Sequence, residues 1–520
     1  MIKQIEIVLP PEKLNDRESL YLAASKKANL NLDEVKTVVI QRRSIDARSR
    51  TPVYRLLCDV YINELPHLAE NKINYKPVKR NNKVIIVGFG PGGMFAALRL
   101  IELGIKPIVV ERGKDVQARR VDLRAIQQFH QVNPDSNYCF GEGGAGTYSD
   151  GKLYTRATKR GDTKKILNVL VQHGANPDIL IDAHPHIGSN KLPNVVKAIR
   201  DTILSCGGEI YFNSRVTDFI VNEGKMSGII VNNNAEVTGN SVILSTGHSA
   251  RDIYYLLHKK NILLEPKPFA MGVRIEHPQP LINELQYHSK ENNQNLPAAS
   301  YSLACTIDER GIYSFCMCPG GIIVPAATAP GEIVVNGMSL SRRDSPFANS
   351  GFVVTVDEKD WTKYNSFYPF GALKLQQELE TLAFELANNT QSAPAQKATD
   401  FVLGKTSQSL SKTSYIPGLT SAPLHEALPK FLVDNLKKGL LYFDKRMKGY
   451  YTEEAQLVAV ESRTSSPVRI PRLKDSLMHP GMNGLFPCGE GAGYAGGIVS
   501  AAIDGENCAD ACAKYILSNK

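Results

Sequence analysis

Alternating apolar and polar residues open the chain. The stretch "IKQIEIVLP", residues 2–10, follows a period of two, which predicts a half-buried β-strand. A helical segment, "SLYLAASKKANL" at 19–30, and two further strand-like runs at 35–45 and 53–62 come after it. One helix and three strands in this order predict a small α+β domain at the N-terminus.

Residues 83–112, "KVIIVGFGPGGMFAALRLIELGIKPIVVER", carry a second pattern. An apolar strand at 84–87 runs into a glycine-rich turn at 88–93, a helix at 94–103 and a second apolar strand at 108–110. This strand–turn–helix–strand order is the context in which a GxGxxG turn binds a dinucleotide. A glycine turn that serves packing alone is the alternative.

Each part of this turn has a physical role in dinucleotide binding. Gly88 permits the sharp turn, Gly90 lets the backbone approach a pyrophosphate, and Gly93 lets the helix pack closely on the strand. The helix N-terminus offers amide donors and a partial positive charge. Glu111, 23 residues after Gly88, is placed to accept hydrogen bonds from a ribose. The predicted nucleotide-binding residues of this segment are Gly88, Gly90, Pro91, Gly92, Gly93, Glu111 and Arg112.

Three later stretches are also rich in small residues. The glycines of the loop "FGEGGAGTYSDGKLYTR", 140–156, would let backbone amides reach phosphate or flavin oxygens. The stretch "NSVILSTGHSARD" reads as a strand that ends at 245–247. In "GLFPCGEGAGYAGGIVSAAIDG", 484–505, an apolar strand leads into a glycine cluster and then a helix. A loop–helix junction made glycine-rich for packing is the alternative for this last stretch.

Nearly the whole chain resembles the uncharacterised FAD-dependent dehydrogenases that carry an N-terminal ferredoxin-like domain. The resemblance rests on "VGFGPGGMFAAL", "FGEGGAGTYSDGKL", "FCMCPGG", "ESRTSSPVRI" and "CGEGAGYAGGIVSAA". It implies an α/β fold in which a discontinuous, Rossmann-like FAD-binding domain of the glutathione-reductase type receives an inserted substrate domain. The expected parts are a small basic ferredoxin-like α+β domain at 1–80, the FAD-binding domain at 81–261, a substrate or cap domain at 262–450 and the C-terminal return at 451–520.

The same resemblance implies how FAD is held. An acidic residue after glycine, Glu490, would hold the ribityl chain, and the following helix would point its N-terminus at the flavin, where it stabilises negative charge on the reduced ring. The backbone at Val216 would contact adenine. FAD is expected to be non-covalent, because no residue stands out as a tether. The further predicted cofactor-binding residues are Gly143, Gly144, Ala145, Gly146, Val216, Thr246, Gly247, Gly489, Glu490, Gly496, Gly497 and Ile498.

The predicted function is that of an FAD-dependent oxidoreductase, a dehydrogenase or reductase that passes hydride through flavin to or from a small-molecule substrate. No second glycine fingerprint follows between 262 and 450, so NAD(P)H is expected only as a transient electron donor. Two alternatives stay open. The protein could be a flavoprotein that recruits nucleic acid or protein through its basic N-terminal domain, to modify it or to sense redox state, or a non-catalytic interaction protein stabilised by FAD.

Candidate catalytic residues are few. His277 and His248 are candidates for proton transfer, although a lone histidine is more often structural. Arg463 in "ESRTSSPVRI" is a candidate anchor for substrate or flavin, with a surface salt bridge as the alternative.

The stretch "SFCMCPGG", 314–321, places two cysteines one residue apart before a proline and two glycines. On a regular strand both thiols would project from one face, with the Cα atoms roughly 6.6 Å apart. A packing or pocket-lining role is the simplest interpretation, and a redox pair is the alternative. No metal is predicted, since a structural zinc needs about four ligands and no second close Cys/His pair is in view.

Composition sets the remaining limits. Hydrophobic residues make up 42% and charged residues 22% of the 520, as in ordinary globular enzymes. No apolar run is long enough for a transmembrane segment, and the start lacks the pattern of a signal peptide. Nine cysteines, mostly isolated, favour a cytoplasmic location. Of the net charge of +9, residues 1–83 hold +6, which is either a solvated face or a patch for an acidic macromolecule.

Overall fold

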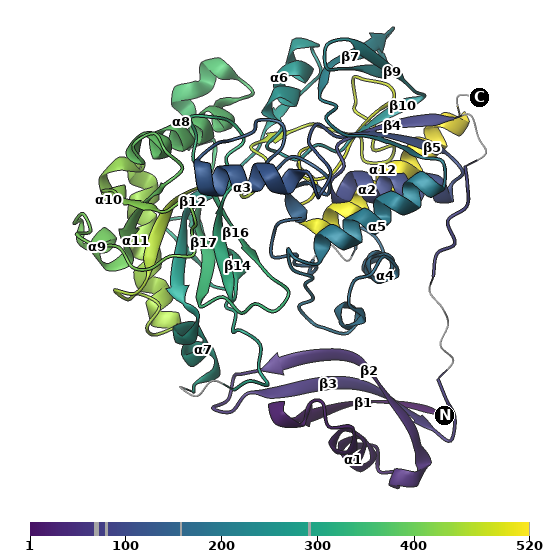
Figure 1. Cartoon of the computed structure of the whole chain (residues 1–520), viewed down its shortest axis with the longest axis vertical. Coiled ribbons are helices and arrows are strands. Elements are labelled where there is room, and N and C mark those ends of the chain that lie inside the picture. The colour runs from purple at the N-terminus through teal and green to yellow at the C-terminus, as the bar shows by residue number, and fades with distance from the viewer. Residues whose placement is uncertain (67–71, 79–81, 156–158, 290–292, 519–520) are drawn as a thin grey trace.

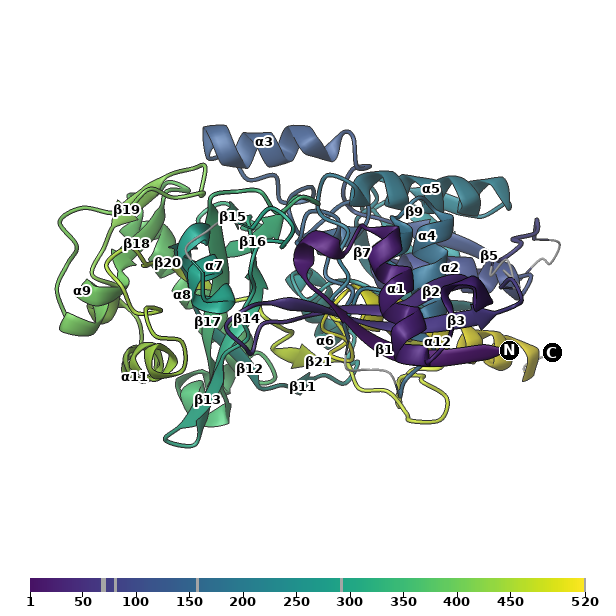
Figure 2. The same ribbon diagram turned by 90° about the horizontal axis from the view of Figure 1, so that it is seen from below.

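The computed structural model describes residues 1–66, 72–78, 82–155, 159–289 and 293–518. These residues form three sheet-based parts, which Figures 1 and 2 show from two directions. A small N-terminal sheet lies at one end of the molecule, and a parallel sheet and a larger mixed sheet lie side by side above it in Figure 1. The polar, proline-containing stretch "INYKPVKRNNK", residues 73–83, predicts a linker, and its residues 79–81 lie outside the described residues.

The N-terminal unit confirms the predicted order of one helix and three strands. It consists of β1 (Ile2–Leu9), α1 (Arg17–Ala28), β2 (Val35–Asp46) and β3 (Val53–Ile62). The antiparallel sheet has the order β1-β3-β2, and α1 packs on β1 and β2. Buried positions alternate along β3, as its period of two predicts. A ferredoxin-like fold is not confirmed, because that fold adds a second helix and a fourth strand that residues 1–66 do not contain.

The arginine-rich stretch "QRRSIDARSR", residues 41–50, is the basic run of this unit, and part of it is used inside the molecule. The Nε atom of Arg43 donates to Asp182 at 2.7 Å, and its Nη2 atom donates to Asp178 at 3.1 Å. Arg48 pairs with Asp46 within the same unit. Asp182, Asp178 and Asp46 therefore neutralise arginines that the sequence alone offered as a surface for an acidic macromolecule.

The parallel sheet draws its strands from distant segments of the chain. Its order is β22-β10-β4-β5-β6, and every pair is parallel. Two helices, α2 and α12, pack against each other on this sheet, and the small antiparallel sheet β7-β8-β9 adjoins β10. The elements are β4 (Lys83–Val87), α2 (Pro91–Glu102), β5 (Lys106–Val110), β6 (Glu209–Tyr211), β7 (Val216–Asn222), β8 (Lys225–Val231), β9 (Ala235–Thr238), β10 (Ser241–Leu244), β22 (Leu485–Pro487) and α12 (Ile498–Ser518).

The sequence of α2 explains its position between the sheet and α12. Its residues are apolar on nearly every side, as expected of a helix that is covered on all faces. Gly505 on α12 lies against the carbonyl oxygen of Gly92, where an added Cβ would come within 2.1 Å. The two helices therefore meet backbone to backbone, which brings the last strand and helix of the chain to the first.

The larger mixed sheet has seven strands in the order β13-β14-β17-β12-β20-β18-β19. All pairs are antiparallel except β18 with β19. Helices α8 and α11 pack against it. Its elements are β12 (Phe269–Pro278), α7 (Gln279–Tyr287), β13 (Ala304–Ile307), β14 (Arg310–Cys318), β17 (Phe347–Val356), α8 (Gly371–Leu386), β18 (Ala393–Lys397), α9 (Ala398–Leu403), β19 (Leu419–Ser421), α10 (Leu424–Ala427), α11 (Lys430–Arg446) and β20 (Gln456–Glu461).

This sheet bears on the expected boundary at 451. Strand β20 follows that boundary in sequence but pairs with β12 and β18, so the return to the parallel sheet comes later, at β22. The four-part division of the chain otherwise stays a prediction.

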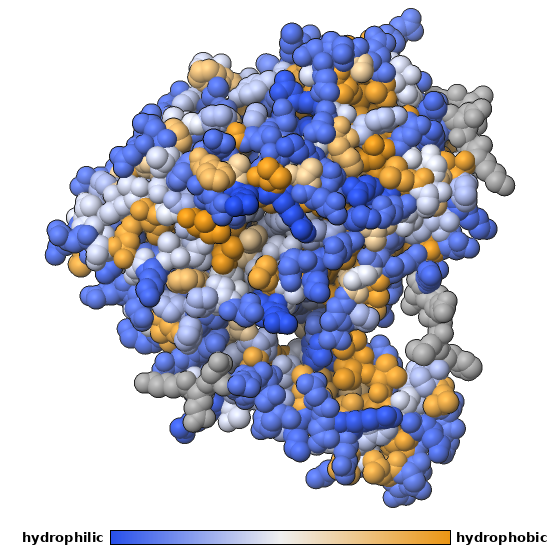
Figure 3. Space-filling view, viewed as in Figure 1, coloured by the Kyte–Doolittle hydropathy of each residue, from blue (hydrophilic) through white to orange (hydrophobic). Residues whose placement is uncertain are grey.

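The remaining elements connect these sheets. They are α3 (Arg119–Phe129), α4 (Thr163–Gln172), α5 (Leu192–Ser205), α6 (Arg251–Lys259), β11 (Glu265–Pro266), β15 (Gly321–Pro325), β16 (Val335–Ser339) and β21 (Val468–Arg469). Among the described residues, every helix is too short or too polar to cross a membrane. Figure 3 shows polar residues over most of one face, with hydrophobic residues gathered on the N-terminal unit at the bottom.

Candidate functional site

A cavity of about 410 Å³ lies at the carboxyl ends of the parallel strands. Residues that directly follow β4, β5, β10 and β22 line it, and the seven-stranded sheet supplies the opposite wall. Open α/β sheets bind their ligands in such a crevice. The cavity brings together all the predicted cofactor-binding residues except Gly93 and Gly143.

The glycines of this region fall into two groups. A Cβ at Gly247, Gly496 or Gly497 would meet nothing within 4 Å, and one at Gly90 would only approach Gly144, at 3.9 Å. These four glycines, which we call the cradle glycines, border open space that a ligand can fill.

Gly93 and Gly143 belong to the second group, because they serve packing. A Cβ at Gly93 would lie 2.0 Å from the Gly88 carbonyl oxygen, and one at Gly143 would lie 1.8 Å from the Thr147 hydroxyl. The role predicted for Gly93, close contact of helix and strand, agrees with this geometry. The predicted cofactor contact of Gly143 has no support from it.

Two helices point their N-termini at the cavity. Gly90 is the N-cap of α2 and Pro91 is its first residue, and α12 begins at Ile498. Residues at both starts line the cavity. The first amides of a helix have no carbonyl partner within it and carry partial positive charge, so both ends favour an anionic ligand.

Glu111 is buried and already holds three backbone amides. Its Oε2 atom accepts from the amide of Phe89 at 2.9 Å, and its Oε1 atom accepts from Gly113 at 2.9 Å and Gly141 at 3.0 Å. The carboxylate therefore ties the glycine turn to two other loops. An ionised carboxylate has about four acceptor positions, which leaves capacity for a ribose hydroxyl.

Arg112 contributes a wall of the cavity. Its guanidinium lies 4.2 Å from the centre of the Phe140 ring and pairs with Asp135 at 2.7 Å and Asp252 at 2.9 Å. The charge of Arg112 is therefore balanced by protein carboxylates, and Arg112 lines the cavity together with Val216.

Arg119, which shapes the glycine loop, was not among the predicted residues. It is fully buried and donates to the backbone carbonyls of Asn137 at 2.7 Å, Glu142 at 3.0 Å and Gly144 at 2.9 Å. Nothing in the pattern of α3 distinguishes this arginine from its exposed neighbours. Its role is visible only once the loop is folded over the helix.

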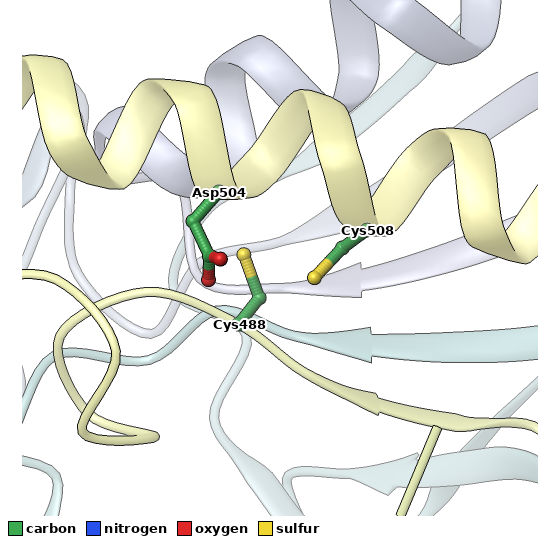
Figure 4. Close-up of side chains that lie close together, drawn as sticks. All are labelled: Cys488, Asp504 and Cys508. Atoms are coloured by element: carbon green, nitrogen blue, oxygen red, sulfur yellow. The ribbon is translucent and has the colours of Figure 1, made fainter. Parts of the chain in front are cut away.

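The sequence also missed a pair that holds the C-terminal turn. Asp504 accepts from the amide of Gly489 at 2.7 Å, and Arg472 donates to Asp504 at 2.6 Å. Figure 4 shows Asp504 gathered with Cys488 and Cys508, and the donor atoms of the three lie within 4.8 Å of one another. Arg472 also lies 3.4 Å from the Cys508 sulfur. The guanidinium of Arg472 thus already supplies positive charge to these three side chains, so the group does not suit a metal ion.

The opposite wall carries a buried ion pair. Arg274 on β12 is fully buried, and its Nη1 atom donates to Glu461 on β20 at 2.7 Å. Its Nε atom donates to Asn349 at 2.7 Å and its Nη2 atom to the carbonyl of Cys316 at 2.9 Å. Burial raises the pKa of Glu461 to about 7, although Arg274 opposes the shift.

The sequence predicted that the two cysteines of "SFCMCPGG" share one face of a regular strand. In the structure this strand is not regular. Strand β14 has a bulge between Phe315 and Cys318, and Cys316 has a φ of +46°. A bulge re-aims side chains. Cys316 consequently lines the cavity, whereas Cys318 is fully buried behind it.

Arg463 lines the cavity, but its donors already have protein partners. Its Nε atom donates to Glu380 at 3.0 Å, and its Nη2 atom donates to Glu332 at 2.7 Å and Glu380 at 2.8 Å. Its Nη1 atom donates to Thr328 at 2.7 Å and Ser249 at 3.3 Å. The five N–H groups are used, so Arg463 is a fixed part of the wall and is poorly suited to anchor a substrate.

The two histidines differ in position. His248 lines the cavity, and its Nε2 atom lies 3.8 Å from Glu490. Burial, followed by the charges of Arg463 and Arg251, lowers the pKa of His248 to about 3, so its ring is neutral.

The structure corrects the prediction for His277. It is fully buried on β12, where its Nε2–H donates to the carbonyl of Tyr450 at 2.8 Å, and it does not line the cavity. Side chains three residues apart on a strand point to opposite faces, so Arg274 faces Glu461 and the cavity wall while His277 packs on the other side. Burial lowers the pKa of His277 to about 4.

Comparison with known proteins identifies two regions of the chain. Residues 268–464, which span most of the seven-stranded sheet, match the family described as FAD-dependent protein, C-terminal domain-like. Residues 1–61 match a domain of unknown function. Among solved structures, CtdE in complex with FAD and a substrate is 12% identical, covers 84% of each chain and has a TM-score of 0.37. A geranylgeranyl bacteriochlorophyll reductase-like protein from Thermoplasma acidophilum is 13% identical, covers 84% of this chain and 80% of that one, and has a TM-score of 0.36.

These structural likenesses are too weak to carry a functional argument. The sequence relative is much stronger: an uncharacterized protein of Clostridium beijerinckii is 40% identical over 500 residues, which cover 92% of this chain and 93% of that one. The chain therefore belongs to the same family as the Clostridium beijerinckii protein.

Proposed function

We propose that this protein is an oxidoreductase that holds one FAD, without a covalent bond, in the cavity at the carboxyl edge of the parallel sheet, in the manner of a glutathione-reductase-type fold. One observation carries the proposal. The four cradle glycines and two helix N-termini, which come from both ends of the chain, border the same open space. The match of residues 268–464 to FAD-dependent proteins supports the choice of cofactor.

The residues around the cavity suit the two halves of FAD differently. The turn from Gly88 to Gly92 and the start of α2 would hold the pyrophosphate, with Glu111 and Val216 on the adenosine side. The loop at 144–146, Glu490 and the start of α12 would hold the ribityl chain and the flavin ring. The positive end of α12 would favour negative charge on a reduced ring.

Bound flavin supplies two-electron transfer to a small-molecule substrate, and the chain's own residues determine what reaches it. Cys316, Glu461 and His248 line the cavity and could contact such a substrate. Burial, and then the charge of Cys316, raise the pKa of Glu490 to about 7. A carboxyl group that titrates near neutral pH can hold or release a proton beside the reacting atoms.

NAD(P)H stays our proposal for a transient electron donor, because residues 262–450 carry no second glycine fingerprint for stable binding. Anaerobic addition of NADH or NADPH to the purified protein tests it, with loss of the flavin's visible absorbance as the readout. Bleaching by either nucleotide supports the donor role. A flavin that stays oxidised with both, yet is reduced by dithionite, means that electrons come from another donor.

The alternative role in binding nucleic acid or protein has less support. Arg43, central to the basic run, already pairs with Asp182 and Asp178. A cytoplasmic location, expected from the use of cysteine, stays a prediction.

Release of the cofactor by mild denaturation tests the proposed function. We expect a yellow protein that releases about one FAD per chain, identified by mass. Bound NAD in place of a flavin would overturn the choice of cofactor.

A further inference from the structure

Cys316 and its neighbours form a cluster that FAD binding alone does not require. Cys316 is partly exposed and lines the cavity, whereas Cys318, two residues on, is fully buried. The bulge in β14 creates this difference, because it interrupts the pairing with β17 between Phe315 and Cys318. Two thiols are thus neighbours in the chain but unequal in access to the cavity.

Two cations approach these thiols from different elements. The ammonium group of Lys152, in the loop after the glycine-rich segment, lies 3.9 Å from the Cys316 sulfur and also donates to the carbonyl of Met317. The Nη2 atom of Arg274, on β12, lies 3.7 Å from the Cys318 sulfur. The thiol of Cys318 donates to the backbone carbonyl of Cys316 at 3.3 Å.

Two nearby carboxylates are paired with arginines, one of which is Arg274 itself. Glu461 pairs with Arg274 at 2.7 Å, and Asp150 pairs with Arg343 at 2.6 Å. Lys152 lies 3.5 Å from Asp150, so it is shared between that carboxylate and the thiol. The charged and titratable groups that face Cys316 are Lys152, Arg274, Cys318, Asp150, Glu461 and Glu490.

These surroundings act on the two thiols in opposite directions. A side-chain hydrogen bond between the two thiols, followed by the charges of Lys152 and Arg274, lowers the pKa of Cys316 against the effect of burial. The same hydrogen bond and burial raise the pKa of Cys318. At neutral pH one thiol is therefore a thiolate open to the cavity, and the other is a protonated thiol behind it. A thiolate is the nucleophile in disulfide exchange.

We propose that Cys316 and Cys318 are the attacking and resolving thiols of a thiol–disulfide exchange centre, and that the substrate of this cavity is a small disulfide. The open position of Cys316 between Lys152 and the cavity makes it the attacking residue. The buried position of Cys318 protects it from the substrate and leaves its sulfur next to the first thiol. This inference rests on the proposed function for its source of electrons.

The exchange is balanced in two steps. In the first, the Cys316 thiolate attacks one sulfur of the substrate, a bond to Cys316 forms, the substrate S–S bond breaks and one thiolate leaves. In the second, Cys318 attacks the Cys316 sulfur and its proton passes to the departing substrate sulfur. A Cys316–Cys318 disulfide forms, the bond between Cys316 and the substrate breaks, and the second substrate sulfur leaves as a thiol. The substrate gains two electrons and the protein dithiol loses two. Reduction of the protein disulfide by two electrons, which bound flavin can supply, restores both thiols.

Dithiobis(nitrobenzoate), a small aromatic disulfide whose released thiolate is coloured, is the probe that tests this inference. The full-length protein is reduced, freed of reductant without oxygen and mixed with the probe under native conditions. We expect wild type to release two coloured thiolates per chain in a fast phase and to keep no adduct. Cys318→Ser should release one and keep one adduct, which peptide mass analysis places on Cys316. Cys316→Ser should lose the fast phase.

Two matched controls separate this pair from the other cysteines. Cys139 also lines the cavity, and Cys305 is a partly exposed cysteine on β13, so Cys139→Ser and Cys305→Ser should keep the wild-type fast phase. Iodoacetamide, a smaller probe, should alkylate Cys316 before any other cysteine. If the fast phase survives in Cys316→Ser, or if wild type keeps a stable adduct after releasing one thiolate, the inference is wrong.

The pH profile of the fast phase tests the role of Lys152. In Cys318→Ser we expect the rate to reach its plateau below the ordinary thiol pKa of about 8.5. Lys152→Met should move that profile to higher pH, whereas a purely structural lysine would leave it in place. Flavin content, measured on the same samples, keeps the two proposals apart. A protein without flavin that shows the fast phase contradicts only the proposed function, and a flavin-loaded protein without it contradicts only this inference.

Discussion

The cavity has one wall made mainly from backbone and another made from charged and thiol side chains. On the first wall, glycine turns and helix N-termini present amides to open space. On the second, Glu461 and Cys316 line the cavity, and Arg274 behind them donates to the Glu461 carboxylate and to the Cys316 carbonyl. The three residues come from three strands of the seven-stranded sheet. The first wall suits a phosphate-bearing cofactor, which backbone amides can bind. The second has the titratable groups that chemistry on a substrate needs.

Because of this difference, the two walls should respond differently to amino-acid substitutions. A cradle glycine can gain a side chain without disturbing its neighbours, at the expense of the ligand's space. A buried ion pair cannot lose one partner without leaving the other charge unbalanced. Substitutions on the first wall should therefore act mainly on cofactor binding, and those on the second mainly on stability and reactivity.

The largest effect is expected within the glycine turn itself. Gly93→Ala would place a Cβ 2.0 Å from the Gly88 carbonyl oxygen, so we expect little folded protein. Gly90→Ala is the matched control, because its Cβ would come no nearer than 3.9 Å to any heavy atom. Yield of folded protein and the melting temperature of both variants measure the difference. Equal stability of the two variants would mean that this helix does not pack on the turn as described.

The next effect concerns the buried ion pair. Arg274→Met leaves the Glu461 carboxylate without its partner at 2.7 Å, and breaking a buried pair in this way typically costs about 3–5 kcal/mol. Urea denaturation of the variant measures the loss in free energy of unfolding. Adding Glu461→Gln to Arg274→Met should recover part of that loss. A double variant as unstable as Arg274→Met alone would show that the loss comes from packing and not from charge.

A redox titration counts the electrons accepted by the flavin, which the first wall holds, and by the two cysteines next to the second wall. Anaerobic titration with dithionite should deliver four electrons per FAD to oxidised wild type, two to the flavin and two to the Cys316–Cys318 disulfide. Cys316→Ser with Cys318→Ser should keep its FAD and accept two. Uptake of two electrons by both forms would return the cysteines to the packing role that the sequence favoured.

The smallest effect is on pH dependence. The pKa of Glu490 is raised to about 7 in the folded protein, mainly by burial, from an unfolded value of about 4.3. Its contribution to stability is therefore complete at low pH and is lost as the pH rises through about 7. Because Glu490→Gln cannot titrate, the stability of the variant relative to wild type should increase with pH across this window in flavin-free protein. His248 titrates in both forms, so its effect cancels. A difference that stays constant with pH would contradict the raised pKa.

Local patterns in the sequence predicted the glycine turns of the first wall, but not Arg119 and Asp504, whose side chains hold those turns. Gly88, Gly90 and Gly93 have distinct roles within one turn, and the apolar strand before it and the helix after it are consecutive in the chain. The strands ending at Val87 and Pro487 could also be predicted, because their apolar runs lead into glycine.

The second wall could not be predicted, since it depends on register between distant strands. Arg274 meets Glu461 because β12 pairs with β20, and Cys316 faces the cavity because of a bulge opposite β17. If β14 is assumed to be a regular strand, in which side chains alternate with a period of two, the thiols are given the wrong orientation. The same limit explains His277, whose direction on β12 the sequence alone did not determine.

Flavin content of Gly90→Val tests the central claim most directly, because the new side chain would enter the proposed pyrophosphate space and its Cβ would lie 3.9 Å from the Cα atom of Gly144. Gly481→Val is the control, since Gly481 lies outside the cavity and its Cβ would have no neighbour within 3.7 Å. We predict about one FAD per chain for wild type and Gly481→Val, and a loss of most of the FAD for Gly90→Val with unchanged circular dichroism. A Gly90→Val protein that retains its full FAD would contradict the placement of the cofactor in this cavity.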